Sequence, residues 1–171
     1  SEAMRQKIIS IAEEIGYYPN QIARGLASNR TSTIGLVVPD NTNPFFAQIA
    51  RGVEETAYEN GYNIYLINTN EDPEREAIAL TSIWQKGIDG LISCSSRLPE
   101  DDLIEQINKF PAVLLFNREL SIPASNTTTI NVNDERGAAM AIQHFVENGR
   151  KKIGYAGGPA NSVSNRRRLA G

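Results

Sequence analysis

Residues 33–60 read TIGLVVPDNTNPFFAQIARGVEETAYEN, and this stretch decides the fold. It opens with an apolar, β-branched run, Ile34–Val38, which is typical of a strand buried on both faces. Asn43-Pro44 follows, and this pair places a capping side chain directly before a proline at the first position of a helix. The amphipathic segment after the pair ends before a glycine, which commonly closes helices. The stretch therefore predicts a buried strand and then a helix over 44–60.

The same unit of strand and helix recurs along the chain. Further strands are predicted at Tyr62–Ile67, Ile88–Cys94, Ala112–Phe116, Thr128–Val132 and Ile153–Ala156, and further helices at Pro73–Lys86, Pro99–Lys109 and Glu135–Asn148. Such alternation predicts an α/β fold, a doubly wound parallel sheet with helices on both faces. In these sheets ligands bind beyond the carboxyl ends of the strands, or in a cleft between two such units.

Composition narrows the class of protein. The chain has 171 residues, 40% of them hydrophobic, which is enough to bury a core. Because no apolar run reaches the ~18 residues of a membrane helix, we expect a soluble, cytoplasmic protein with no membrane partner. The net charge of −3 means that any contact with DNA must be local. Residues 15–32 contain Arg24 and Arg30 and no acidic side chain, so the N-terminal end is the basic end.

Sequence motifs of catalysis are missing. The chain has no phosphate loop, dinucleotide fingerprint, nucleophile elbow or paired-histidine zinc motif. His144, the one histidine, lies inside a predicted helix, and Cys94, the one cysteine, ends a predicted strand as a small apolar residue. We therefore expect no catalytic residue, no metal and no cofactor.

The N-terminal end differs from this body. Ser1–Ile15 has apolar side chains at helical spacing and predicts a helix. Tyr17-Tyr18-Pro19 then predicts an extended break, and a second, short helix begins with Asn20 as its N-cap.

Three segments together resemble the lactose/galactose repressor family of transcription regulators. YPNQIARGLA at 18–27 resembles that family's hinge helix, and IGLVVPD at 34–40 with NPFF at 43–46 resembles the first strand and helix of its effector-binding core. SVSNRRRLAG at 162–171 is similar to a turn that contacts the effector in the second subdomain. The resemblance covers the whole chain, and it implies a periplasmic-binding-protein-like core and a fragment of a longer regulator.

The resemblance also implies a division of the chain. Residues 1–18 correspond to the third helix of a helix-turn-helix headpiece and 19–32 to the hinge helix and linker. Residues 33–150 correspond to the first core subdomain, and 151–171 to the start of the second. An eight-residue helix is too short to be stable alone in water, so we expect DNA to order the hinge when two copies enter the minor groove. The hinge residues expected to contact DNA are Asn20, Gln21, Ala23, Arg24 and Leu26, with Leu26 as the apolar wedge.

For the effector, the resemblance implies a sugar-like ligand between the two subdomains. Phe45 and Phe46 are adjacent on a helix, about 100° apart, so one faces the sheet and the other can line the cleft. Arg168 matches the family's ligand-binding arginine, which donates two hydrogen bonds. The full set of expected effector-binding residues is Asn41, Phe45, Phe46, Asn117, Ser162, Ser164 and Arg168.

The resemblance therefore implies a homodimeric, DNA-binding repressor whose small-molecule effector alters the binding of operator DNA through the hinge. The effector is expected to be a carbohydrate, and a purine stays open, as does the sign of regulation. A periplasmic-type sugar receptor without DNA binding shares the core and is the alternative, although it would not explain the headpiece-like helix. A cytoplasmic α/β enzyme is the third reading and would need a catalytic cluster.

Overall fold

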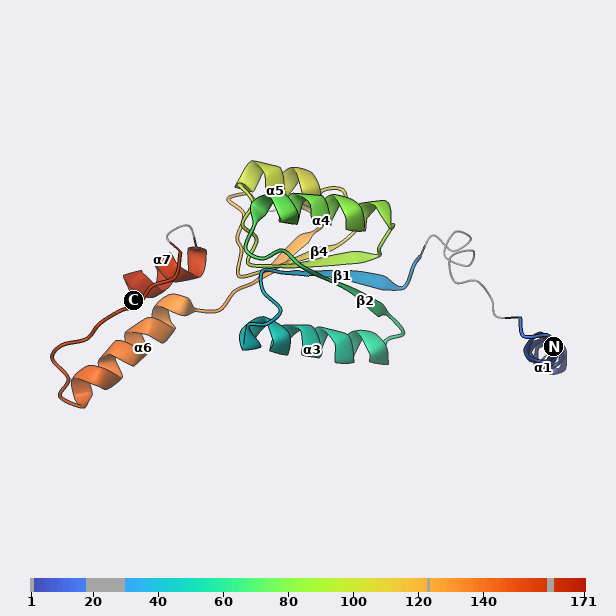
Figure 1. Ribbon diagram of the computed structural model, residues 1–171, viewed down its shortest axis with the longest axis horizontal. Helices are drawn as coiled ribbons and strands as arrows, with labels where there is room; N and C mark the ends of the chain where they lie inside the picture. Colours follow the sequence, from blue (N-terminus) through green and yellow to red (C-terminus); the bar gives the residue numbers. More distant parts are fainter. Residues whose placement is uncertain (1, 18–29, 123, 160–161) are drawn as a thin grey trace.

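The computed structural model describes residues 2–17, 30–122, 124–159 and 162–171. Its centre is a five-stranded parallel sheet in the order β2-β1-β3-β4-β5 (Figure 1). The strands are β1 (Thr33–Val38), β2 (Asn63–Asn68), β3 (Gly90–Cys94), β4 (Val113–Phe116) and β5 (Thr127–Ile130). β1 pairs with both β2 and β3, so the strand order switches beside β1, and the predicted doubly wound α/β fold is confirmed.

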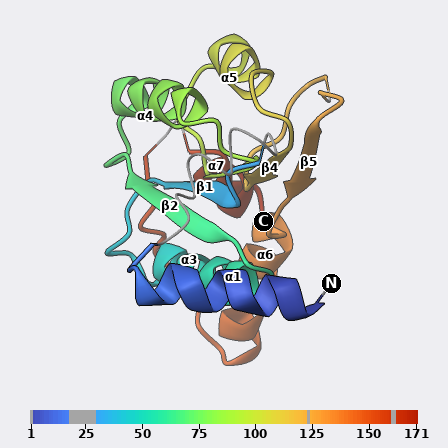
Figure 2. The ribbon, with the colours of Figure 1, turned by 90° about the vertical axis from the view of Figure 1, so that its right-hand side faces the viewer.

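Helices cover both faces of this sheet, as Figures 1 and 2 show from two directions. α3 (Pro44–Glu59) lies on one face, and α4 (Pro73–Gln85) and α5 (Glu100–Ile107) lie on the other. Two apolar clusters fill the space between the layers. The larger cluster includes Leu80, Ile83, Leu103 and Ile107 from the helices and Leu91, Val113 and Leu115 from the strands, and the smaller one joins Phe46 to Leu36, Val38 and Cys94.

Capping side chains determine where α3 and α4 begin. The side chain of Asn43 accepts a hydrogen bond from the backbone N–H of Phe45, at 3.0 Å. Asp72 accepts from Glu74 and Arg75 in the same way, so each cap satisfies N–H groups that the helix itself leaves unpaired. α5 starts after Pro99 without a side-chain cap and ends at Ile107, two residues before its predicted end.

The two ends of the chain lie at opposite ends of the sheet (Figure 1). α1 (Glu2–Glu14) lies beyond the amino ends of the strands, and its apolar residues Ile8 and Ile11 are exposed, as is Ile15 just after it. α6 (Asp134–Glu147) and α7 (Val163–Ala170) lie beyond the carboxyl ends and pack against each other. The predicted boundaries between headpiece, hinge and subdomains stay predictions.

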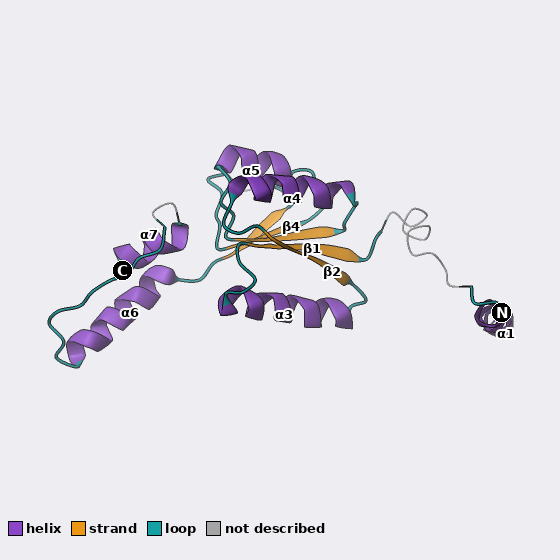
Figure 3. Ribbon diagram, viewed as in Figure 1, coloured by secondary structure: helices purple, strands orange, loops and turns teal. Residues whose placement is uncertain are grey.

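One predicted strand is wrong. Ile153–Ala156 belongs to an irregular segment between α6 and α7, drawn as a loop in Figure 3. A strand needs a neighbour for its backbone hydrogen bonds, and the sheet of the described residues contains only the five strands named above. The apolar pattern is present, but no described segment pairs with 153–156 to make it a strand.

Candidate functional site

The candidate site lies at the carboxyl ends of the strands, where α6 and α7 approach the sheet (Figure 1). β1 runs into the loop that begins α3, β4 runs into Asn117, and β5 runs into the segment that begins α6. Parallel strands end at one edge, so these three connections meet at that edge. The fold thus places several of the expected effector-binding residues on adjacent connections.

The two phenylalanines separate as their helical spacing predicts. Phe46 is 6% exposed and packs in the core between α3 and the sheet. Phe45 is 41% exposed, and its ring centroid lies 5.9 Å from that of Phe116, the last residue of β4. Phe45 therefore offers an aromatic face at the strand ends, whereas Phe46 is a core residue.

The loop after β1 is held by polar contacts. The Asp40 carboxylate accepts from the hydroxyl and the backbone N–H of Thr42, at 2.7 and 2.9 Å, and these bonds lower the pKa of Asp40 below its usual value. The backbone N–H of Asn41 donates to the Asn68 side chain at 3.0 Å. These contacts fix the loop backbone, and the residue Asn41 itself is exposed.

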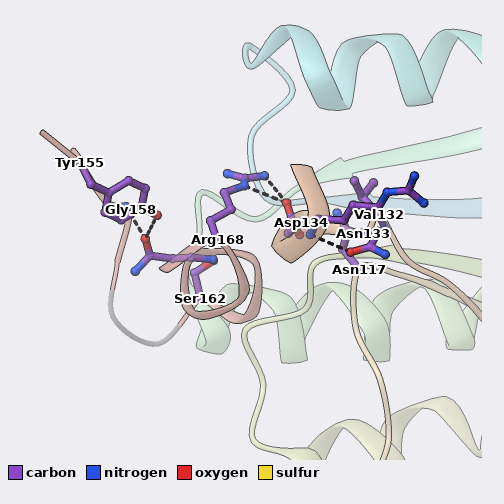
Figure 4. Close-up of polar contacts among 10 residues, drawn as sticks. Asn117, Val132, Asn133, Asp134, Tyr155, Gly158, Ser162 and Arg168 are labelled. Carbon is purple, nitrogen blue, oxygen red and sulfur yellow. Dashed lines mark hydrogen bonds and ion pairs between the residues drawn. The ribbon is translucent and has the colours of Figure 1, made fainter. Parts of the chain in front are cut away.

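Asn117 has a partner within the chain. It adopts a positive φ of 53°, is 5% exposed, and its Oδ1 accepts from the backbone N–H of Val132 at 2.8 Å (Figure 4). The resemblance implied that Asn117 binds the effector, and the contact with Val132 was not predicted. Asn117 therefore binds the backbone of the segment that leads from β5 to α6.

Residues 163–170 form a helix where the sequence predicted a turn. Ser162 is its N-cap, buried, and its Oγ accepts from the N–H of Asn165 at 3.3 Å. Ser164 is half-buried in the first turn. Asn165 was not singled out from the sequence, yet its Oδ1 accepts from the Tyr155 hydroxyl and the Gly158 N–H, at 2.8 and 3.0 Å. These bonds hold the irregular segment against α7 (Figure 4).

Arg168 forms an ion pair with Asp134, the first residue of α6 (Figure 4). Its Nε and Nη2 lie 2.8 and 2.7 Å from the same carboxylate oxygen, Oδ1. The Asp134 side chain is 3% exposed and that of Arg168 is 53% exposed. Sequence reasoning missed Asp134, because a lone acidic residue at the start of a helix is common and its partner is 34 residues away.

A second ion pair joins α7 to the segment that follows β4. Arg167 Nη2 lies 2.6 Å from Glu119 Oε2, and Glu119 follows β4 while Arg167 belongs to α7. Phe45, Phe116, Asn117, the segment 132–134 and Arg168 thus form a continuous series of contacts from α3 to α7.

A hollow of about 590 Å³ lies between α6, α7 and residues 153–155, and Asp134 and Arg168 contribute to its lining. Its other walls include Ile142, Phe145 and Leu169. These apolar walls offer few hydrogen-bond partners, whereas Asp134 and Arg168 are polar residues of the lining.

The side chain of Cys94 is not a ready nucleophile. Cys94 is buried, and desolvation raises the pKa of its thiol to about 12, so it is a neutral thiol at physiological pH. Within residues 2–17, 30–122, 124–159 and 162–171, no group of acidic, histidine or cysteine side chains is arranged to hold a metal ion.

No helix in these ranges is both long and apolar enough to cross a bilayer. The predicted DNA-contacting residues Asn20, Gln21, Ala23, Arg24 and Leu26 lie outside the described residues.

A five-stranded parallel sheet with helices on both faces is the architecture of periplasmic-binding-protein-like α/β domains, and the chain has that architecture. The chain belongs to the LacI family, because residues 31–171 match the family described as "Periplasmic binding proteins and sugar binding domain of LacI family".

Curated relatives match the chain beyond that domain. It is 34% identical over 173 residues to the HTH-type transcriptional repressor PurR of Photobacterium profundum, covering 100% of this chain and 51% of the relative. It is 33% identical over 162 residues to catabolite control protein A of Priestia megaterium, covering 94% of this chain and 48% of that protein. The chain therefore spans about half the length of these relatives.

Solved structures of regulators also match this chain. A putative ribose operon repressor from Burkholderia thailandensis is 36% identical, with a TM-score of 0.74 over 82% of this chain and 53% of its own. A regulator from Alkaliphilus metalliredigens QYMF complexed with D-xylulofuranose is 33% identical, with a TM-score of 0.71 over 81% of this chain and 49% of its own. The lac repressor dimer bound to operator and the anti-inducer ONPF has a TM-score of 0.83 over 99% of this chain and 51% of its own, at 24% identity, a likeness of fold.

Proposed function

We propose that the protein containing this chain is a cytoplasmic, homodimeric transcription repressor, not an enzyme, which binds a sugar-like effector between two α/β subdomains and couples that binding to operator DNA. The observation that carries the proposal is the series of contacts at the strand ends, from Phe45 through Asn117 to Arg168. The names of the relatives support the regulatory role, since one is called a transcriptional repressor and the other a catabolite control protein.

The chemistry of these residues suits a polyhydroxylated ligand. An exposed aromatic ring such as that of Phe45 packs against the apolar C–H face of a sugar, and a guanidinium donates to its hydroxyl groups. Asn41 and Ser164 would supply further amide and hydroxyl groups, which both donate and accept. In this proposal Phe46 and Ser162 support the site from within the core and as the N-cap of α7.

The linker to the proposed hinge is attached to the opposite end of the sheet. The backbone N–H groups of Thr31 and Ser32 each donate to the Asp89 carboxylate, at 2.9 Å. Arg30 Nη2 also lies 2.5 Å from the Tyr62 hydroxyl. A linker held in this way transmits a movement of the subdomain to the hinge helices, which DNA orders in pairs. Because coupling is reciprocal, operator DNA changes effector affinity by the same factor.

A sugar receptor without DNA binding is the competing function. The match to PurR extends over 100% of this chain, including residues 1–30, which precede the sugar-binding domain. That extent favours a regulator.

The test uses the full-length protein and its Leu26→Ala variant. We would measure binding to genomic DNA fragments across a range of salt concentrations, with pentoses, hexoses, disaccharides and purines. We expect one fragment to bind tightly, one small molecule to shift that affinity, and the variant to lose at least about tenfold in specific affinity, because an apolar wedge is gone. Non-specific binding, which depends on phosphate contacts, should persist in the variant.

If a sugar binds while no fragment binds better than random DNA, the protein is a receptor and the repressor proposal is wrong.

A further inference from the structure

Arg168 contacts Asp134 through two of its nitrogens and one carboxylate oxygen. Both Nε and Nη2 of Arg168 point at a single oxygen, Oδ1 of Asp134, at 2.8 and 2.7 Å (Figure 4). The carboxylate is almost wholly buried, whereas half of the arginine side chain is exposed. One edge of the guanidinium is therefore anchored in the protein, and Nη1 takes no part in that anchor.

The position of the carboxylate is itself fixed. The Asp134 backbone N–H donates to the Val132 carbonyl at 2.9 Å, and Val132 is in turn held by Asn117. Asn133 is the N-cap of α6, so the carboxylate stands at the positive end of a helix, where a negative charge is stabilised. Asp134 Oδ2 is buried without a hydrogen-bond partner among the described residues. The backbone bond to Val132 and the start of α6 therefore hold the Asp134 side chain beside Arg168.

The ion pair weakens the positive electrostatic field that Arg168 presents to a ligand. An unpaired arginine would attract an anionic group, but a carboxylate at 2.7 Å cancels most of its field at the distance of a bound ligand. The N–H groups on the free edge still donate hydrogen bonds, and a neutral hydroxyl oxygen accepts them without bringing a second negative charge near Asp134.

We propose that Asp134 is a positioning residue that aims Arg168 and makes the effector site selective for neutral, hydroxyl-bearing ligands over anionic ones. This inference rests on the proposed function and adds the charge class of the effector to it. The simpler alternative is that the ion pair only holds α6 against α7, in which case its loss changes stability but not the choice between ligands.

The experiment is calorimetric titration of the full-length protein with D-ribose, D-fructose and D-glucose, each paired with a phosphate ester of the same sugar. The variant Asp134→Asn keeps the size of the side chain and removes its charge. Glu119→Gln is the matched control, because it removes the carboxylate beside the neighbouring Arg167 and leaves Arg168 paired. Thermal midpoints are recorded for every variant.

In the wild type we expect a neutral sugar to bind at least about tenfold more tightly than its phosphate ester. Asp134→Asn should narrow that ratio by about tenfold or more, by weakening the neutral sugar and strengthening the ester. Glu119→Gln should leave the ratio within about threefold of the wild type. Asp134→Glu, which keeps the charge on a longer side chain, should bind the neutral sugar less tightly and yet retain the preference over the ester.

An unchanged ratio in Asp134→Asn, or a wild type that prefers the ester, overturns the positioning role while leaving a sugar-responsive repressor intact. If Asp134→Asn does not fold, loss of the preference in Asp134→Glu has the same consequence. If no member of the wider panel used to test the proposed function binds the wild type or alters its DNA binding, the proposed function fails, and this inference fails with it.

Discussion

At the scale of single residues, Gly35 shows what the sequence pattern could not reveal. A Cβ at this position would lie 2.7 Å from Ile88 Cδ1 and 3.0 Å from Ile83 Cγ2, and both isoleucines are buried. Gly35→Ala should therefore destabilise the protein by about 1–3 kcal/mol, as overpacking does in a filled core.

The control is Gly52→Ala in α3, where the added Cβ meets no atom within 4 Å. This change should leave stability unchanged or raise it by up to about 1 kcal/mol, because alanine favours helices. Urea unfolding of both variants provides the measurement. If both variants change the free energy of unfolding equally, then Ile83 and Ile88 can move aside, and the close approach at Gly35 does not limit the residue at this position.

The sequence predicted the positions of some site residues but not the contacts of others. Phe45 and Phe46 were separable by helical geometry alone, since two adjacent side chains cannot share one face. Asn117 and Asp134 were not predictable in their contacts, because their partners, Val132 and Arg168, are 15 and 34 residues away. A single sequence shows which residue types are present but not which distant ones meet.

At the scale of elements, local chemistry determined what could be predicted. Helices α3 and α4 begin at their predicted prolines, because an Asn or Asp cap and a proline act on the chain locally. The segment 153–156 has an apolar pattern typical of a strand, but strand formation depends on a neighbour, and the prediction was wrong there.

Replacing the cap of α4 tests this local account. Asp72→Ala removes the acceptor for the Glu74 and Arg75 N–H groups, at 2.9 and 3.4 Å, and should cost about 1 kcal/mol. Asp101→Ala, in the exposed first turn of α5, removes a similar charge without removing a cap and should cost less than about half as much. Chemical denaturation compares the two, and a larger loss in Asp101→Ala would contradict the capping argument.

At the scale of the whole molecule, the ion pair between Glu119 and Arg167 joins α7 to the segment after β4, at 2.6 Å. Glu119 also accepts from the side chain of Asn131 at 2.8 Å, so it is fixed on the sheet side. In a two-state repressor such a pair stabilises the orientation of subdomains in which it forms, by no more than about 1 kcal/mol because it is partly exposed. That free energy corresponds to a shift of about fivefold between the two states.

We therefore expect Glu119→Gln and Arg167→Gln in the full-length protein to change effector affinity by up to about fivefold. Operator affinity should change as well, because both ligands respond to the same shift between the two subdomain orientations. The double variant should resemble either single one, because each removes the same interaction. Calorimetry for the effector and fluorescence anisotropy for the operator measure both affinities in one double-mutant cycle. Additive effects in the double variant would mean that the two side chains act independently, and the pair would then have no part in setting the orientation of α7 relative to the sheet.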